Sequence, residues 1–211
     1  MNLPVPLMPP VGAVAAALGV SAHAVDLCRH SELIDLHIDT FIPPRLWGYD
    51  PLSRHRAALF GRAFFGHLDL YRMADGGLKG AMWSITTNPS RGAASRWAVF
   101  QKNLARLQDL VQRSEGHLAI ARDLAEYRAV RARGAHAVMI SVQGANALDA
   151  APGGFAAVPD RLVVRATLVH LTNSALGTTN SPLSVLRSRK GLTDHGRAVV
   201  AELNRQRIFV D

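Results

Sequence analysis

The stretch that decides the fold is LIDLHIDT at residues 33–40, in which apolar and ionisable side chains alternate. The ionisable ones are Asp35, His37 and Asp39. A period of two is typical of a β-strand with two unlike faces. His37 and Asp39 then share one face where the strand ends, and a nitrogen ligand beside an oxygen ligand suits a divalent metal ion. The alternative is a buried histidine whose hydrogen bonds are satisfied by the neighbouring aspartate.

Length and composition indicate one globular domain with a substantial core. The chain has 211 residues, of which 48% are hydrophobic. Its net charge of +8 comes almost wholly from arginines that are scattered along amphipathic segments. Such scattering is typical of solvated helix faces and argues against a nucleic-acid partner. Cys28 is the only cysteine, so no internal disulfide can form, and we expect a reducing, cytoplasmic location.

The first 30 residues are expected to form an arm and a helix. Residues 1–10 contain four prolines, and residues 11–20 are small and apolar. The apolar run is too short to span a bilayer, and no basic segment precedes it. We therefore expect an irregular arm, a helix near residues 11–30 and no membrane span, with a degenerate signal peptide as the alternative. Residues 31–211 form the main domain in this interpretation.

Strand-like and helix-like segments alternate along that main domain. Strands are predicted at residues 33–39, 80–86, 137–142 and 162–168, and from residue 208 onward. Helices are predicted at residues 95–113, 123–133 and 193–206, the last with Thr193 as its N-cap. A long loop is predicted at residues 41–77. This alternation predicts an α/β fold with a parallel sheet.

Such a sheet can close in two ways, as an open doubly wound sheet or as a (β/α)₈ TIM barrel. No glycine-rich phosphate loop follows the first strand, which argues against a dinucleotide-binding sheet. Polar side chains gather at the carboxyl ends of the predicted strands, among them His37, Asp39, Gln143 and His170. A barrel collects those ends around one pocket. The barrel is therefore favoured, in incomplete form, because only about five strands are present and a complete barrel takes ~250 residues.

A series of short motifs runs through the predicted strands in a fixed order. They are IDLHID at 34–39, GGLKGAMWS at 76–84, SVQG at 141–144, TLVHLTN at 167–173, GLTDHGR at 191–197 and IFVD at 208–211. Over roughly residues 30–211, this series resembles the membrane (renal) dipeptidase family of zinc peptidases. The resemblance implies a TIM barrel with a two-metal site, usually zinc. It also implies hydrolysis of short peptides or related small amides by metal-activated water.

The resemblance also assigns roles to individual residues. His37 and Asp39 correspond to two metal ligands on the first strand, and Gln143 falls where the family has a glutamate that bridges both metals. His170 corresponds to a histidine that contacts the substrate and helps to polarise the scissile carbonyl. Two further metal-binding histidines and a catalytic aspartate of the family lie beyond the position of Asp211. No catalytic residue is therefore assigned, and this chain alone is expected to be inactive.

Gln143 is a departure from the family pattern with chemical consequences. An amide offers one good acceptor oxygen and no charge, whereas a bridging carboxylate offers two oxygens and a negative charge. Two zinc ions about 3.5 Å apart need anionic bridges to offset their repulsion. Gln143 can still ligate one metal ion. The sequence therefore leaves open a one-metal site, a different metal, or a loss of peptidase activity.

Two functions follow from these residues. The first is a metal-dependent hydrolase of the dipeptidase type, favoured by His37, Asp39 and His170. The second is a non-catalytic barrel homologue that binds a small ligand or partner, favoured by Gln143. Unpaired strand edges in an incomplete barrel also lead us to expect that the isolated chain is aggregated or molten, or is rescued by self-association into a homo-oligomer.

Other ionisable residues receive structural predictions. Asp35 is expected on the ligand face, deeper in the barrel. His136 is expected to begin a strand, His67 to lie in a loop, and His195 to lie on a helix surface.

Overall fold

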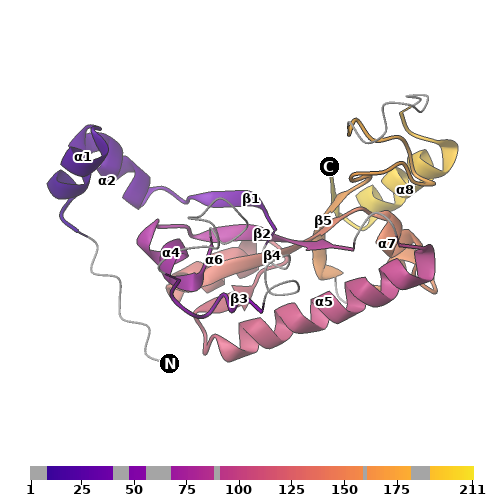
Figure 1. Cartoon of the computed structure of the whole chain (residues 1–211), viewed down its shortest axis with the longest axis horizontal. Helices are drawn as coiled ribbons and strands as arrows, with labels where there is room; N and C mark the ends of the chain where they lie inside the picture. The colour runs from indigo at the N-terminus through magenta and orange to yellow at the C-terminus, as the bar shows by residue number, and fades with distance from the viewer. Residues whose placement is uncertain (1–8, 40–47, 56–67, 88–90, 159–160, 182–190) are drawn as a thin grey trace.

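The computed structural model describes residues 9–39, 48–55, 68–87, 91–158, 161–181 and 191–211 (Figure 1). Its helices are α1 (Val11–Leu18), α2 (Ala22–His30), α4 (Leu70–Asp75), α5 (Ala93–Arg113), α6 (Leu124–Ala132), α7 (Asn146–Asp149) and α8 (Asp194–Arg205), with a 3₁₀ helix, η1, at Gly154–Ala157. Its strands are β1 (Ile34–Ile38), β2 (Gly80–Thr86), β3 (Leu118–Ile120), β4 (His136–Gln143), β5 (Val163–Thr167) and β6 (Phe209–Val210).

The strands form one parallel sheet in the order β1-β2-β4-β5-β6. Apart from β3, this order rises steadily along the chain. A doubly wound sheet reverses its strand order at a switch point, whereas a barrel adds each strand beside the previous one. The order therefore confirms the predicted parallel α/β fold and favours the barrel over the open sheet.

Strand β4 is paired along both of its edges. β2 runs beside its whole length, from Gly80 opposite Ala137 to Thr86 opposite Gln143. β3 pairs with the first residues of β4 and β5 with the last ones, from Ile140 onward. Because a strand has only two edges, β3 and β5 both pair with the edge of β4 that is not paired with β2. β4 is thus the centre of the sheet.

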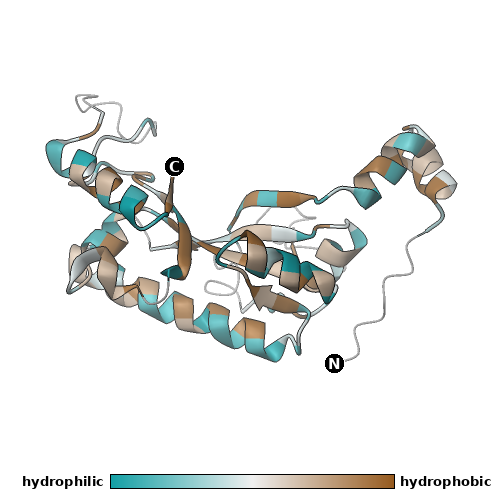
Figure 2. Cartoon of the chain, turned by 180° about the vertical axis from the view of Figure 1, so that it is seen from behind, coloured by the Kyte–Doolittle hydropathy of each residue, from teal (hydrophilic) through white to brown (hydrophobic). Residues whose placement is uncertain are grey.

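One face of the sheet packs against α5, which runs along it in Figure 1. Trp83 and Ile85 of β2 lie in the main hydrophobic cluster with Phe100 and Leu107 of α5, and all four are fully buried. The buried residues of α5 recur every three or four positions, and hydrophilic and hydrophobic bands alternate along it in Figure 2. Burying this apolar surface stabilises the fold by roughly 25 cal/mol per Å².

The opposite face of the sheet carries α6 at the amino ends of the strands. Ala137 and Met139 of β4 cluster there with Tyr127 and Val130 of α6. Gly80 allows this close approach, because an added Cβ would lie 3.2 Å from both Ala137 Cβ and the Tyr127 ring. Toward the carboxyl ends of the strands, the strand register places polar side chains on this same face of the sheet. These side chains lie at the candidate site.

The amino-terminal segment differs from the single helix expected near residues 11–30. It forms two helices, because Gly19 adopts a left-handed conformation (φ 66°) and Ser21 begins α2 by accepting a hydrogen bond from Ala24 N. The pair projects from the end of the molecule opposite α8 (Figure 1). No single helix among the described residues is long and apolar enough to cross a membrane, although α1 and α2, bent by 116°, pass that test as a pair.

The loop expected at residues 41–77 contains a helix, α4. The Asp69 carboxylate caps it by accepting a hydrogen bond from Arg72 N at 2.8 Å, and Asp69 is fully buried. A cap of this kind stabilises a helix by about 1 kcal/mol. Much of the remaining loop, including His67, lies outside the described residues.

Candidate functional site

His37 and Asp39 come together at the carboxyl end of β1. His37 Nε2 lies 3.3 Å from Asp39 Oδ1, and each side chain is about one-third exposed. The shared face predicted from the period of two is confirmed for this pair. Asp35 does not share it, because an irregularity between Asp35 and Ile38 inserts one residue into the register with β2. Asp35 is exposed, and its carboxylate accepts a hydrogen bond from His37 N at 2.9 Å.

The Asp39 carboxylate has a property that suits a cation. Its Oδ1 atom is buried and has no hydrogen-bond partner in the part of the chain that the structure describes. Its contact with His37 Nε2 at 3.3 Å is an ion pair and not a hydrogen bond of good geometry. A buried carboxylate oxygen that accepts no hydrogen bond is costly, and a metal ion would relieve that cost. The same described residues contain no group of three or more His, Cys, Asp or Glu side chains placed to hold a metal. Among the described residues, His37 and Asp39 thus offer one nitrogen and one oxygen ligand, and a divalent ion held there would need further ligands.

Arg165 links β5 to β1 across the sheet. It is buried, and its NH1 group donates to Leu36 O at 2.7 Å and to His37 Nδ1 at 3.1 Å. Its NH2 group donates to Asp211 Oδ2 at 2.6 Å, which also accepts a 2.7 Å hydrogen bond from the Thr167 hydroxyl. Arg165 was not predicted from the sequence. A charged side chain inside the apolar strand at 162–168 was the available signal.

These contacts fix the protonation of the neighbouring groups. An arginine only donates hydrogen bonds, so His37 Nδ1 accepts and the proton of the neutral ring is on Nε2, facing Asp39. A cation between His37 and Asp39 would replace this proton. Burial raises the pKa of Asp211, but the hydrogen bonds from Thr167 and Arg165 and the charge of Arg165 lower it further, so the net pKa is below the ordinary aspartate value.

Gln143 ends β4 on the same face of the sheet as Thr86, its register partner on β2. Its Oε1 atom accepts a hydrogen bond from the Thr86 hydroxyl at 2.9 Å. One lone pair of the acceptor oxygen is therefore engaged with a neighbouring strand, and the second lone pair is left for a further interaction. The role of Gln143 as a metal ligand stays a prediction.

His170 lies beyond the end of β5, near the His37–Asp39 pair. Burial lowers its pKa below the ordinary histidine value, the Asp39 charge raises it, and the His37 charge lowers it. His170 is therefore neutral near pH 7. Its loop is fastened by the Thr179 hydroxyl, which donates to His170 O, and by Asn173 Oδ1, which accepts from Thr179 N at 3.0 Å.

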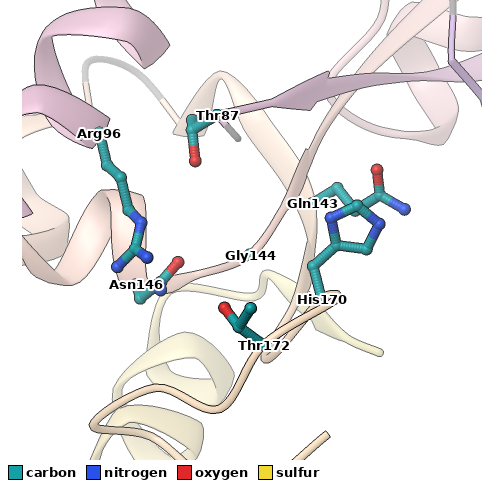
Figure 3. Close-up of a pocket in the computed structure, with 7 residues that line it drawn as sticks. All are labelled: Thr87, Arg96, Gln143, Gly144, Asn146, His170 and Thr172. Atoms are coloured by element: carbon teal, nitrogen blue, oxygen red, sulfur yellow. The ribbon is translucent and has the colours of Figure 1, made fainter. Parts of the chain in front are cut away.

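A pocket joins the carboxyl ends of β2, β4 and β5. It is lined by residues from these ends and from two helices, namely Thr87, Arg96, Gln143, Gly144, Asn146, His170 and Thr172 (Figure 3). Gln143 and His170, which are 27 positions apart in the sequence, thus face one space, as the barrel prediction required.

The fold agrees with a comparison to protein families. The model of the membrane dipeptidase family, peptidase family M19, matches residues 21–211. The chain belongs to the membrane dipeptidase family. The family predicted from the motif series is therefore confirmed, and the match extends over α2 as well as the sheet.

Solved structures similar to this membrane dipeptidase family member confirm the incomplete TIM barrel. A dipeptidase described as an M19 metallopeptidase has 24% sequence identity and a TM-score of 0.67, covering 85% of this chain and 55% of its own. A metallopeptidase from Rhodobacter sphaeroides, solved with a phosphinate mimic of the dipeptide L-Ala-D-Ala, has 23% identity and a TM-score of 0.64, covering 85% and 57%. The probable dipeptidase PvdM from Pseudomonas aeruginosa has 19% identity and a TM-score of 0.70, covering 90% and 48%. The chain spans about half the length of these structures.

Two histidines of this family member lie away from the site, as expected. His136 begins β4, and His195 lies on α8, where its Nε2 atom is 2.9 Å from Asp149 Oδ1. His195 and Asp149 are thus a second histidine–aspartate pair, outside the pocket.

Proposed function

We propose that this chain takes part in metal-dependent hydrolysis of dipeptides or related small amides. The observation that carries the proposal is the His37–Asp39 pair, whose buried carboxylate oxygen lies 3.3 Å from His37 Nε2 and accepts no hydrogen bond from the described residues, at the carboxyl end of the first strand of a membrane dipeptidase family fold. Active sites of TIM barrels lie at this end of the strands.

Zinc is the metal we propose, because an imidazole nitrogen and a carboxylate oxygen are both zinc ligands. A bound divalent ion would supply Lewis acidity and lower the pKa of water toward neutrality. His37 and Asp39 would hold it, and Arg165 would keep the His37 ring in place through its contacts with Leu36 O and His37 Nδ1. His170, neutral near pH 7, has one N–H group to donate to the carbonyl oxygen of a substrate as negative charge develops there.

Removing the two candidate ligands should abolish tight zinc binding. We expect the double variant His37→Ala/Asp39→Ala to bind Zn²⁺ about a hundredfold more weakly than the unmodified chain, at roughly 1.4 kcal/mol per factor of ten. Competition with a colorimetric chelator measures the affinity, and elemental analysis measures the stoichiometry. His195→Ala/Asp149→Ala removes a pair of the same composition outside the pocket and serves as the control. Equal zinc affinity in the two double variants would contradict the assignment.

A non-catalytic, ligand-binding barrel is the second candidate function. The observation that favours it is the neutral Gln143 side chain at the family's bridging position, which offers one oxygen that already accepts a hydrogen bond from the Thr86 hydroxyl. A neutral side chain there offsets none of the repulsion between two dications.

Restoring the negative charge should therefore raise metal occupancy. We expect Gln143→Glu to increase the zinc bound per chain and to tighten the binding by about tenfold, because a carboxylate adds an anionic oxygen ligand. Gln112→Glu, at an exposed position of α5, adds the same charge elsewhere and should leave occupancy unchanged. Elemental analysis after gel filtration is the measurement. If the unmodified chain already holds two tightly bound ions, the argument from charge is wrong.

A further inference from the structure

Three buried oxygen atoms near the candidate site make no hydrogen bond with the described residues. They are Asp39 Oδ1, the Ser84 hydroxyl on β2 and the Ser141 hydroxyl on β4. They make up half of the six buried side-chain atoms without a hydrogen-bond partner in the described part of the chain. Ser84 and Ser141 are each 1% exposed. Leaving such a group unpaired is costly, so three of them close together point to a bound ligand.

The strand register brings these three oxygens to one level of the sheet. Ser84 and Ser141 are register partners on β2 and β4. Ile38 of β1 is the register partner of Trp83 on β2, so the next residue, Asp39, lies level with Ser84. The three atoms therefore form one row across β1, β2 and β4, here called the oxygen row.

The two serines share the face that carries the candidate site. Thr86 and Gln143 lie two residues further along the same strands, and the Thr86 hydroxyl donates to Gln143 Oε1 at 2.9 Å. Side chains two residues apart point to the same side of a strand. Ser84 and Ser141 thus lie one layer nearer the amino ends of the strands than this pair, beneath the pocket that Gln143 lines.

Arg165 encloses the oxygen row on the side away from the sheet. It is the register partner of Ser141 on β5, and its NH1 group donates to Leu36 O and His37 Nδ1 on β1. Strands β2 and β4 lie between β5 and β1 in the sheet. The Arg165 side chain therefore crosses the face that carries the row, which accounts for the near-complete burial of the serines.

The chemistry of the row selects a neutral ligand that both donates and accepts hydrogen bonds. The Asp39 carboxylate repels an anion. Serine hydroxyls are not among the usual ligands of divalent ions, which prefer imidazole, thiolate, carboxylate and carbonyl groups. An ionised carboxylate only accepts hydrogen bonds, whereas a hydroxyl donates and accepts. Water satisfies all three groups, and a buried water typically makes about three hydrogen bonds.

The spacing of the strands also fits one water molecule. Neighbouring strands lie about 4.8 Å apart, and a water bonded to a hydroxyl on each of two strands spans up to about 5.6 Å, at about 2.8 Å per hydrogen bond. A carboxylate has about four lone-pair sites, so Asp39 can accept from this water and still ligate an ion.

We propose that a single water molecule is bound by Asp39 Oδ1 and by the hydroxyls of Ser84 and Ser141. It completes the hydrogen bonds of all three groups and holds the Asp39 carboxylate from beneath, as outer hydrogen bonds hold the carboxylate ligands of metal sites. The inference goes beyond the proposed function and does not depend on it, because the chain binds this water without a metal ion.

Oxygen-17 magnetic relaxation dispersion of the metal-free 211-residue chain tests the proposal, because its amplitude counts the water molecules that stay bound for longer than the protein takes to tumble. We expect Ser84→Ala/Ser141→Ala to lose the amplitude of one water, and Asp39→Ala to lose the same amplitude. Ser114→Ala is the matched control. Ser114 is also buried, but its hydroxyl already accepts from Leu118 N at 3.0 Å, so this variant should retain the full amplitude.

The stability of the serine variants gives a second readout. If the two hydroxyls had no partner, their replacement by alanine would remove the cost of burying them and would stabilise the fold. With the bound water, Ser84→Ala and Ser141→Ala should each raise the equilibrium constant for unfolding in urea about fivefold, the worth of one hydrogen bond. The double variant should be about as stable as either single variant, because the water is lost with its first partner.

Several outcomes would overturn the inference. They are the lack of a long-lived water in the unmodified chain, an unchanged amplitude in Ser84→Ala/Ser141→Ala or in Asp39→Ala, an equal loss in Ser114→Ala, serine variants that are more stable than the unmodified chain, and additive effects of the two serine replacements. Since these measurements require neither zinc nor turnover, their outcome is separate from the zinc affinity of the His37→Ala/Asp39→Ala variant.

Discussion

Gly196→Ala should destabilise the fold by about 3 kcal/mol or more, which is at the upper end for overpacking a buried position. Gly196 lies in the first turn of α8 and is buried against the loop that follows β5. An added Cβ would lie 1.9 Å from Leu176 O and 2.8 Å from Leu176 C. Both are backbone atoms, so the contact cannot be relieved by a change of side-chain rotamer.

The loop that would have to move is the one that carries His170. Thr193, the N-cap of α8, ties it down by donating its hydroxyl hydrogen to Ala175 O at 2.6 Å and by accepting from Gly196 N at 2.9 Å. We therefore expect Gly196→Ala to lower the midpoint of urea unfolding and to perturb the His170 resonances. Gly12→Ala is the control, because no atom lies within 4 Å of an added Cβ in α1. An unchanged midpoint in Gly196→Ala would show that α8 does not pack on this loop.

His136 should make stability fall with acidification over the range where histidine titrates. Burial lowers its pKa from 6.5 to about 4, the hydrogen bond to Leu78 O acts in the opposite direction, and the Arg131 charge lowers it further. Trp83 Nε1 donates to His136 Nε2 at 3.2 Å, so the second ring nitrogen, 3.2 Å from Leu78 O, carries the proton of the neutral form. A protonated ring would lose the hydrogen bond from Trp83.

The direction of the pH dependence follows from the lowered pKa. Between pH 6.5 and about 4 the unfolded chain binds a proton at His136 and the folded chain does not. The stabilisation is therefore complete above pH 6.5 and is lost as the pH falls toward 4. The loss amounts to about 2 kcal/mol at pH 5 and about 3 kcal/mol at pH 4, at 1.36 kcal/mol per pKa unit.

Urea unfolding followed by tryptophan fluorescence at pH 7.5, 6 and 5 measures this effect. His136→Gln should flatten the pH dependence by the stated amount, because glutamine does not titrate. His195→Gln replaces a half-exposed histidine and should leave the dependence of the unmodified chain in place. The same slope in all three proteins would contradict a buried neutral His136.

The first strand shows how far periodicity can predict a site and where it stops. Alternation placed His37 and Asp39 on one face, and the 3.3 Å contact between them confirms it. It misplaced Asp35, because an irregularity adds one residue to one strand only and reverses the faces on its two sides. Nothing in the sequence of a single strand marks such an insertion when its partner strand lies more than 40 residues away.

Local signals predicted the helices well where caps and amphipathic spacing agreed. Thr193 caps α8 as predicted, and α5 ends at Arg113 as predicted. The break between α1 and α2 was missed although Gly19 and Ser21 are both boundary residues, because a single glycine inside a helical pattern is tolerated. The α4 helix was missed because it is only six residues long and lies within a polar stretch.

Side chains that meet through the tertiary fold could not be predicted from local patterns. Arg165 contacts His37 across 128 positions of sequence, and Arg96 reaches the pocket from a helix whose other face is core. The family motifs identified His170 and Gln143 by their place in a series, but the partner of Gln143 on β2, Thr86, follows only from the register of two strands.

The uneven pairing of the sheet has a consequence for its motions. β4 is hydrogen-bonded along both edges, whereas β1 pairs only with β2 among the described strands. Opening β1 therefore breaks hydrogen bonds to one neighbouring strand, whereas opening β4 breaks hydrogen bonds along both edges. The free energy of opening is thus lower for β1, and its amide protons exchange faster. The strand that carries His37 and Asp39 is thus held less firmly than the centre of the sheet. Any ion bound by this pair would stabilise the paired form of β1 by mass action. Occupancy by the ion would therefore slow hydrogen exchange at the amides of β1.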